Sequence, residues 1–462
     1  MDDSFLEYLH GSLGVTHVWY TGIIRHASGQ DWTKGEAGSP YAIEDYFDVN
    51  PYLADNQDDR LNEFRQLVER THGKGMKVLI DFVPNHVARN CTSYFGAEDD
   101  KSVHWRAEND FFYYPGEKLR LPFNSSYEED PAKASGNAFT ACPDINDWYD
   151  TIKLNYCQFH TATWDKMLKV LKYWKSMGVD GFRCDMVELV PREAISYLIS
   201  ETRKEYPDTI FIAEVYERSG YEYYYKEAGF DALYDKCGLY DCLYSIVRNN
   251  VAGEYPESSA KDITANWKFL GNLQEGMLNF LENHDEVRLA GPLFARDVNN
   301  SYAALYVSLL FNTAPFMLYF GQEVGEYEQR TTIFDWNKPE SVYELSSYIQ
   351  GIASMSYWRH EVLQKYKDLL AYAGKDIIRL GGTYDLMYCN QDGNLDTDRH
   401  FAFLRAWKGD INLIVVNFSS SDATVEVNIP SEAFAWAGRP DEGSRKVTVS
   451  VLAGDGTIIR NI

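Results

Sequence analysis

The stretch GFRCD, residues 181–185, closes a short apolar segment with a charged pair of side chains. A helical pattern of apolar residues precedes it over Thr163–Gly178, and another follows over Pro191–Tyr206. Arg183 and Asp185 are two residues apart, so a strand places both side chains on one face. A strand that lies between two helices and ends in an acid is typical of a parallel sheet whose carboxyl ends carry the chemistry.

Three further segments have the same form, an apolar run that ends in polar residues. They are DFVPNH (residues 81–86), FIAE (residues 211–214) and LENHD (residues 281–285). The carboxyl ends of parallel strands meet at one edge of a sheet. We therefore predict one pocket that gathers the acids and histidines of the four segments: Asp81, His86, Asp185, Glu214, His284 and Asp285.

Predicted strands and helices alternate along most of the chain, which favours a closed (β/α)8 barrel of the TIM type. A doubly wound sheet would carry a Gly-rich turn after an early strand, and the sequence offers none. The chain opens with a helical pattern, Ser4–Ser12, so the first strand of an eight-stranded barrel has no counterpart. The seven predicted strands are Val15–Tyr20, Lys77–Val83, Asp180–Val187, Ile210–Val215, Phe230–Tyr234, Met277–Glu282 and Pro315–Phe320.

Two regions interrupt this alternation. Residues 87–160 are rich in Tyr, Asn, Asp and Pro and are too long for a simple loop. After about residue 375, short β-type segments alternate with Gly, Asp, Asn and Ser turns, as in an antiparallel sheet. We predict a barrel over 1–86 and 161–375, an inserted B domain over 87–160, and a C-terminal antiparallel β-sandwich domain over 376–462.

The composition excludes some partners and suits others. A net charge of −25 argues against nucleic acid and against anionic membrane surfaces. No apolar run approaches the roughly 20 residues that cross a bilayer. The 34 Tyr and 11 Trp offer flat faces with polar edges, which suit sugars. No signal peptide is visible in MDDSFL at the N-terminus, and the sequence leaves a cytoplasmic, periplasmic or secreted location open.

A pair of carboxyl groups on either side of one bond can hydrolyse a glycoside. The guanidinium of Arg183 favours the ionised form of Asp185, which suits a nucleophile. Glu214 follows an apolar run, and burial there favours the protonated form that an acid/base needs. Asp285 supplies a third acid, and His86 and His284 can donate hydrogen bonds to sugar hydroxyls.

The four segments, in this order and spacing, resemble the four signature regions of the alpha-amylase family of glycoside hydrolases (family thirteen). CPDIN, residues 142–146, resembles the fifth region of that family. The resemblance covers roughly residues 4–430. It implies a retaining mechanism in which Asp185 is the nucleophile, Glu214 the acid/base and Asp285 the stabiliser of the transition state.

The resemblance also implies the substrate and the residues that hold it. Starch-like glucans or maltooligosaccharides with α-1,4 links would be cleaved through a covalent glycosyl-enzyme. Tyr41, in GSPYAIEDY (residues 38–46), resembles the stacking tyrosine, although the usual Gly-Tyr pair is absent. The sugar-binding residues implied are Tyr41, Asp81, His86, Arg183 and His284.

Calcium stays open as a cofactor. Some family members bind it through the first-region Asn, which matches Asn85, and through a Lys-His after the nucleophile. Here MVEL, residues 186–189, follows Asp185 instead. The acidic stretch Asp392–Asp398 spaces oxygen ligands at every second residue but lacks the Gly and Glu of a calcium loop, which favours a solvated hairpin loop.

Three alternatives remain at this level. The same site could serve an α-glucan transglycosylase or isomerase. The chain could be a carbohydrate-binding relative without catalysis, although all three acids are present. A barrel metallohydrolase would use Asp81, His86, Asp185, Glu214 and His284 as ligands, but it lacks the His-x-His pair after a first strand.

Overall fold

The computed structural model describes residues 1–157, 159–328, 333–336, 339–391 and 393–462. The chain forms two compact units. The first comprises Met1–His10, Val15–Leu233 and Thr332–Asn337, and the second comprises Gly11–Gly14, Tyr234–Thr331 and Lys338–Ile462. No helix among the described residues is long and apolar enough to cross a membrane.

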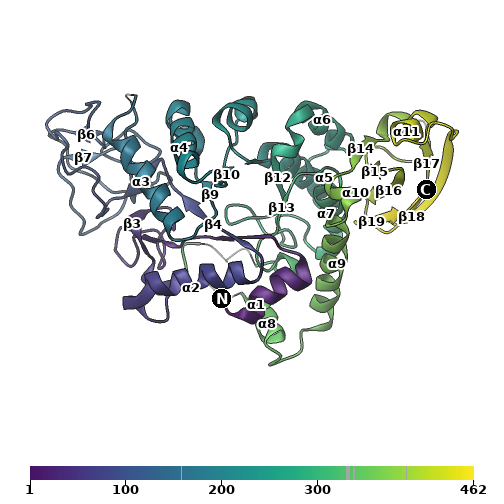
Figure 1. Cartoon of the computed structure of the whole chain (residues 1–462), viewed down its shortest axis with the longest axis horizontal. Coiled ribbons are helices and arrows are strands. Elements are labelled where there is room, and N and C mark those ends of the chain that lie inside the picture. The colour runs from purple at the N-terminus through teal and green to yellow at the C-terminus, as the bar shows by residue number, and fades with distance from the viewer. Residues whose placement is uncertain (158, 329–332, 337–338, 392) are drawn as a thin grey trace. The chain divides into compact units, whose positions relative to one another are not determined.

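A parallel sheet forms the centre of the first unit (Figure 1). Its strand order is β1-β4-β9-β10-β11, and each neighbouring pair is parallel. These five strands confirm the first five that the sequence predicts. Their bounds are β1 (His17–Tyr20), β4 (Lys77–Phe82), β9 (Gly181–Cys184), β10 (Ile210–Ala213) and β11 (Ala232–Tyr234).

Helices connect these strands at the predicted places. In α3 the indole rings of Trp164 and Trp174 are buried, as the apolar stripe of the sequence predicts. The helix ends just before Gly178, whose φ of +94° only glycine adopts without strain. The helices are α1 (Asp3–Glu7), continued by a π-helical turn, α2 (Arg60–Gly73), α3 (Ala162–Ser176) and α4 (Arg192–Glu205).

The region predicted as an insertion contains little regular structure. Two short antiparallel pairs organise it, β5 with β8 and β6 with β7. A further antiparallel hairpin, β2 with β3, precedes α2 and was not predicted from the sequence. The strands are β2 (Ile24–His26), β3 (Ile43–Val49), β5 (His86–Ala88), β6 (Tyr113–Tyr114), β7 (Ala132–Lys133) and β8 (Thr151–Lys153).

The second unit continues the alternation with a parallel pair, β12 (Met277–Phe280) and β13 (Phe316–Met317). The second of these is shorter than the predicted Pro315–Phe320. Helix α7 is buried along its whole length, which explains its continuous apolar sequence. The helices are α5 (Asp241–Ala252), α6 (Lys261–Leu270), α7 (Tyr302–Leu310), α8 (Glu340–Ile349), α9 (Tyr357–Ala373), α10 (Asp376–Arg379) and α11 (Ser431–Trp436).

The C-terminal part of this unit holds two antiparallel sheets, as predicted. One has the strand order β14-β15-β16-β19, and the other pairs β17 with β18. The strand predicted over Tyr384–Tyr388 ends early, because the Asp385 carboxylate accepts the Met387 N–H and starts a 3₁₀ turn. The strands are β14 (Gly382–Asp385), β15 (His400–Trp407), β16 (Asp410–Asn417), β17 (Ala423–Ile429), β18 (Arg445–Val451) and β19 (Gly456–Ile459).

Candidate active site

Three neighbouring strands of the first unit carry the predicted acids at or directly after their carboxyl ends. Asp81 lies within β4, Asp185 directly follows β9, and Glu214 directly follows β10. Arg183 lies opposite Asp81 in the β4–β9 register. All four side chains are almost completely buried, although the sheet core is apolar. Buried charges need partners, so their contacts decide what the cluster can do.

The guanidinium of Arg183 is the centre of this cluster. Its Nη1 lies 2.6 Å from Asp185 Oδ1 and 3.9 Å from Asp81 Oδ1. Its Nη2 lies 2.8 Å from Glu214 Oε1. The sequence predicts the pairing of Arg183 with Asp185, but the contact with Glu214 is a finding of the structure. One cation therefore brings both candidate catalytic carboxyl groups to the same place.

The carboxyl group of Glu214 is also held from its other side. Its Oε2 accepts the Met186 N–H at 2.8 Å, and its Oε1 accepts the Tyr216 O–H at 2.8 Å. Met186, directly after Asp185, has a φ of +44°, in the left-handed region that few non-glycine residues adopt. This unusual turn aims the Met186 N–H at Glu214, so the backbone after one acid fixes the orientation of the other.

Tyr41 lies against Arg183 and Asp81. Its ring centroid is 5.3 Å from the Arg183 guanidinium carbon, and its O–H donates to Asp81 Oδ1 at 3.3 Å. Asp81 Oδ2 accepts the Gly22 N–H at 3.1 Å. Trp19, at the end of β1, faces the same guanidinium at 5.4 Å. Cation–π contacts of this kind help to hold a buried arginine in one orientation.

His86 is buried beside the inserted region. Its ring lies 5.1 Å from the Trp148 ring, and its Nδ1 is 3.1 Å from Asn85 Nδ2. Burial, reinforced by the nearby charge of Lys153, lowers the pKa of His86 to about 3. The imidazole is therefore neutral at neutral pH, where it can still donate one hydrogen bond to a hydroxyl group.

His284 and Asp285 follow β12 in the second unit. His284 Nε2 lies 3.1 Å from Asp285 Oδ2, and the imidazole is buried while the carboxylate is 42% exposed. The Asn283 side chain accepts the backbone N–H groups of Asp285 and Glu286, which closes the turn after the strand. The structure thus joins the two predicted residues of this unit in one polar turn that leaves the acid accessible.

Glu282 supports this turn from inside. It is completely buried, lies 3.1 Å from Arg288 and accepts the Leu289 N–H. Burial is the main reason why the pKa of Glu282 is raised to about 7. The sequence contains this residue in LENHD, but its apolar surroundings become visible only in the fold.

Glu282→Gln is expected to change the pH dependence of stability. Because its folded pKa lies above the unfolded value of 4.5, the carboxyl group contributes stability below pH 4.5 that is lost as the pH rises through about 7. The free energy of unfolding of the native protein relative to Glu282→Gln should therefore fall by about 3 kcal/mol over this window. Urea denaturation of both proteins at pH 4.5 and at about pH 7 measures this difference in the free energy of unfolding. The exposed Glu275→Gln serves as the control, and a pH-independent difference for Glu282→Gln would contradict the assignment.

The oxygens that could hold calcium are already in use. Asn85 Oδ1 accepts from Lys153 Nζ, and its Nδ2 donates to the Gly136 carbonyl at 3.0 Å. Lys153 Nζ also donates to the Leu189 carbonyl at 2.7 Å. Burial lowers the pKa of Lys153 to about 8, so a positive charge remains there at pH 7. An ammonium group takes the place where a cation would bind, and the residues do not fit calcium.

The other candidate metal sites gain no support. Within the described part of the chain, no three His, Cys, Asp or Glu side chains are grouped as a metal site needs, so the metallohydrolase alternative is not supported. In the stretch 392–398, Asp392 lies outside the described residues. Its neighbours have protein partners: Asn394 accepts the Glu426 N–H and Asp398 pairs with Lys261.

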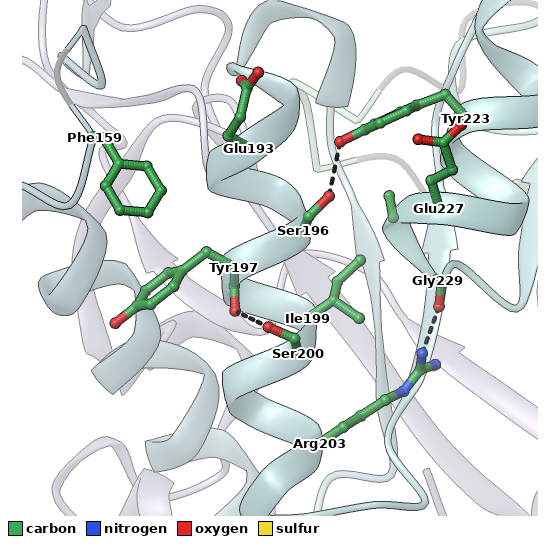
Figure 2. Close-up of a pocket in the computed structure, with 11 residues that line it drawn as sticks. Phe159, Glu193, Ser196, Tyr197, Ile199, Ser200, Arg203, Tyr223, Glu227 and Gly229 are labelled. Atoms are coloured by element: carbon green, nitrogen blue, oxygen red, sulfur yellow. Dashed lines mark hydrogen bonds between the residues drawn. The ribbon is translucent and has the colours of Figure 1, made fainter.

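A separate cavity of about 620 Å³ lies on the surface of the first unit, away from these residues (Figure 2). It lies between α4 and the π-helix Tyr223–Ala228, and Phe159 stands at its edge. Its polar groups largely bond to one another, as in the 2.8 Å contact between Ser196 and Tyr223. None of the predicted site residues lines it, so it is not the candidate active site.

Comparison with known proteins identifies related sequences. The profile of the alpha amylase catalytic domain matches residues 4–359. Alpha-amylase MalA of Haloarcula japonica is 25% identical over 478 residues, covering 98% of this chain and 59% of that protein. Alpha-amylase 2 of Dictyoglomus thermophilum is 26% identical over 327 residues, covering 70% of this chain and 48% of that protein. A cyclomaltodextrin glucanotransferase of Geobacillus stearothermophilus is 26% identical over 396 residues, covering 79% of this chain and 51% of that protein.

Solved structures show the same fold. The native debranching enzyme of Nostoc punctiforme superimposes with a TM-score of 0.70 at 18% identity, covering 99% of this chain and 88% of that one. The alpha-amylase of H. orenii superimposes with a TM-score of 0.68 at 19% identity, covering 100% of this chain and 95% of that one. The predicted barrel with its inserted and C-terminal domains is thereby confirmed as the fold class.

The parallel strands and the solved structures define a barrel of the alpha-amylase type, with acids at the carboxyl ends of its strands. With its catalytic-domain match over most of its length, the chain belongs to the alpha-amylase family. It spans about half to three fifths of the length of the curated relatives that it matches, 48% in one case and 59% in another.

Some contacts at this site were not predicted from the sequence. Tyr216 contacts Glu214, and Trp19 contacts Arg183. Lys153 contacts Asn85. Tyr216 stands two residues after Glu214, and Trp19 stands near the end of a predicted strand, so both carried a positional signal. Lys153 carried none, because 68 residues separate it from Asn85.

Proposed function

We propose that this chain is a retaining glycoside hydrolase that cleaves α-1,4 bonds of starch-like glucans or maltooligosaccharides. The observation that supports it most is the guanidinium of Arg183, which contacts the carboxyl groups of both Asp185 and Glu214. Retaining glycosidases need two carboxyl groups only about 5–5.5 Å apart, whereas inverting enzymes leave room for a water between them. A shared cation favours the closer arrangement.

In the first step an Asp185 oxygen attacks the anomeric carbon and the glycosidic C–O bond breaks. Glu214 gives its proton to the leaving oxygen, and the sugar remains bound to Asp185 as an ester. In the second step Glu214 takes a proton from water, whose oxygen displaces Asp185 and restores both groups. Asp285 would stabilise the positive charge that develops on the ring in each transition state.

The remaining residues would hold the sugar in place. Neutral His86 can donate a hydrogen bond to a hydroxyl, and we assign the same role to His284. Tyr41 offers an aromatic face, and Asp81 fixes that tyrosine through its hydroxyl. Arg183, whose Nη1 lies 2.6 Å from Asp185 Oδ1, would hold that carboxyl group in place for the attack.

The anomeric configuration of the first product tests the mechanism. Two displacements at one carbon retain the α configuration, so NMR during hydrolysis of a maltooligosaccharide should detect the α-anomer before mutarotation. Chromatography of products from a panel of α-glucans then defines the linkage and chain length. An initial β-anomer would show a single displacement and overturn the retaining assignment.

Transglycosylation is the second candidate, because matched relatives include a cyclomaltodextrin glucanotransferase. The same ester would then transfer its sugar to a hydroxyl of another glucan instead of water. Longer or cyclic products would favour transfer, whereas accumulation of short reducing sugars alone favours hydrolysis. Glucan binding without any turnover would identify a carbohydrate-binding relative.

Two substitutions of Tyr41 should separate its ring from its hydroxyl. Tyr41→Ala removes the face that would lie against the sugar, and KM for maltooligosaccharides should rise about tenfold, which corresponds to about 1.4 kcal/mol of lost binding. Tyr41→Phe keeps the ring and removes the hydroxyl, with its 3.3 Å bond to Asp81, so KM should change much less. Equal effects of the two variants in steady-state kinetics would contradict a stacking role.

A further inference from the structure

The side chain of Lys153 connects three separate segments of the first unit. Lys153 lies at the end of β8, in the inserted region. Its ammonium group donates to Asn85 Oδ1 in the turn after β4 and, at 2.7 Å, to the Leu189 carbonyl after β9. These oxygens belong to residues that are 68 and 36 positions away along the chain. The ammonium group therefore forms hydrogen bonds to the loops that follow two different barrel strands.

Backbone hydrogen bonds place the same residues in register. Lys153 pairs with His86 across the β5–β8 ladder, and its N–H donates to the Ala134 carbonyl at 3.0 Å. The Asn85 carbonyl accepts the Leu154 N–H at 3.0 Å. Asn85 is fully buried, so its side-chain oxygen needs a donor in the absence of water. The Lys153 ammonium supplies that donor.

The donor set differs from what calcium requires. Calcium takes six to eight oxygens, usually with carboxylates among them. Here the oxygens around Lys153 are one amide and one carbonyl, and the family's Lys-His after the nucleophile is replaced by MVEL. An ammonium group within bonding distance of Asn85 would also repel a second cation.

We propose that Lys153 is a built-in structural cation that ties the inserted region to the turns after β4 and β9, in place of a bound calcium ion. These two hydrogen bonds fix the positions of Asn85 and Leu189. Asn85 is next to His86, and Leu189 lies four residues after Asp185. The folded state of this chain is then independent of calcium, because the cation is part of the polypeptide.

Thermal unfolding of the native protein is the first test. Circular dichroism is followed with excess EDTA and, separately, with added calcium chloride. The two melting temperatures are expected to agree within about 1 °C, which is about the shift that 1 kcal/mol produces in a chain of 462 residues. A melting temperature lower in EDTA by several degrees would overturn the proposal. This readout needs no enzymatic activity, so it stands apart from the proposed function.

Lys153→Met is the second test, since it keeps the length of the side chain and removes its charge. The melting temperature should fall by about 2–6 °C, because Asn85 Oδ1 and the Leu189 carbonyl lose their donor. Lys118→Met is the control, because Lys118 is 71% exposed in the inserted region. Equal melting temperatures for the two variants would overturn the proposal.

Lys153→Arg covers the case in which Lys153→Met does not fold. It keeps the positive charge and can donate to both oxygens, so it should unfold above Lys153→Met or fold where that variant does not. Its melting temperature should also be insensitive to EDTA. A folded Lys153→Arg that requires calcium would show that a metal ion, and not the side chain, holds these turns.

Discussion

Glu214→Gln is expected to lower the rate of maltooligosaccharide hydrolysis by about 10²–10⁴-fold, the range that general acid–base catalysis contributes. The amide has nearly the same shape, but its single oxygen can keep only one of the hydrogen bonds from Met186 and Tyr216, because these reach different oxygens of the carboxyl group. It has no proton to give to a leaving sugar. The loss should therefore fall on kcat, with sugar binding retained.

A substrate that needs no acid separates this role from a structural one. Fluoride leaves without protonation, so formation of the glycosyl-enzyme from α-maltosyl fluoride should be much less affected in Glu214→Gln. Added azide, which needs no base, should then attack the ester and give an α-glycosyl azide. Glu217→Gln, an exposed change three residues away, is the control. An equal loss with both substrates would contradict the acid/base role.

The sequence predicted the fold well because its signals are local. Each barrel strand is a short apolar run between helices, and the predicted acids lie near or shortly after the carboxyl ends of their strands. All seven predicted strands are found, in bounds that shift by a few residues. Arg183 and Asp185 could be paired from the sequence because alternation along one strand places them on one face.

What the sequence did not predict depends on contacts between distant segments. The hairpin of β2 (Ile24–His26) and β3 has irregular register, which blurs the alternation that identifies a strand. The contact of Arg183 with Glu214 joins two strands and depends on their stagger. The bond from Lys153 to Asn85 joins an inserted region to the barrel, and no local pattern reports such a bond.

Asp185→Asn is expected to abolish hydrolysis, with a loss of about 10⁴-fold or more, as when a covalent nucleophile is removed from other enzymes. Unlike Glu214→Gln, it should be equally inactive on maltooligosaccharides and on α-maltosyl fluoride, because no ester can form with either. The fold should persist, since Arg183 keeps its contact with Glu214. Circular dichroism checks the fold, and steady-state rates on both substrates measure the loss.

The product formed with azide identifies the role of Asp185. Asp185→Ala, which unlike Asp185→Asn removes the side chain, opens that face to a small anion, and azide can then attack α-maltosyl fluoride once, directly at the anomeric carbon. A single displacement inverts the centre and gives the β-glycosyl azide, whereas Glu214→Gln should give the α form. Opposite configurations from the two variants would assign one carboxyl group to attack and the other to proton transfer. The same configuration from both would refute that division.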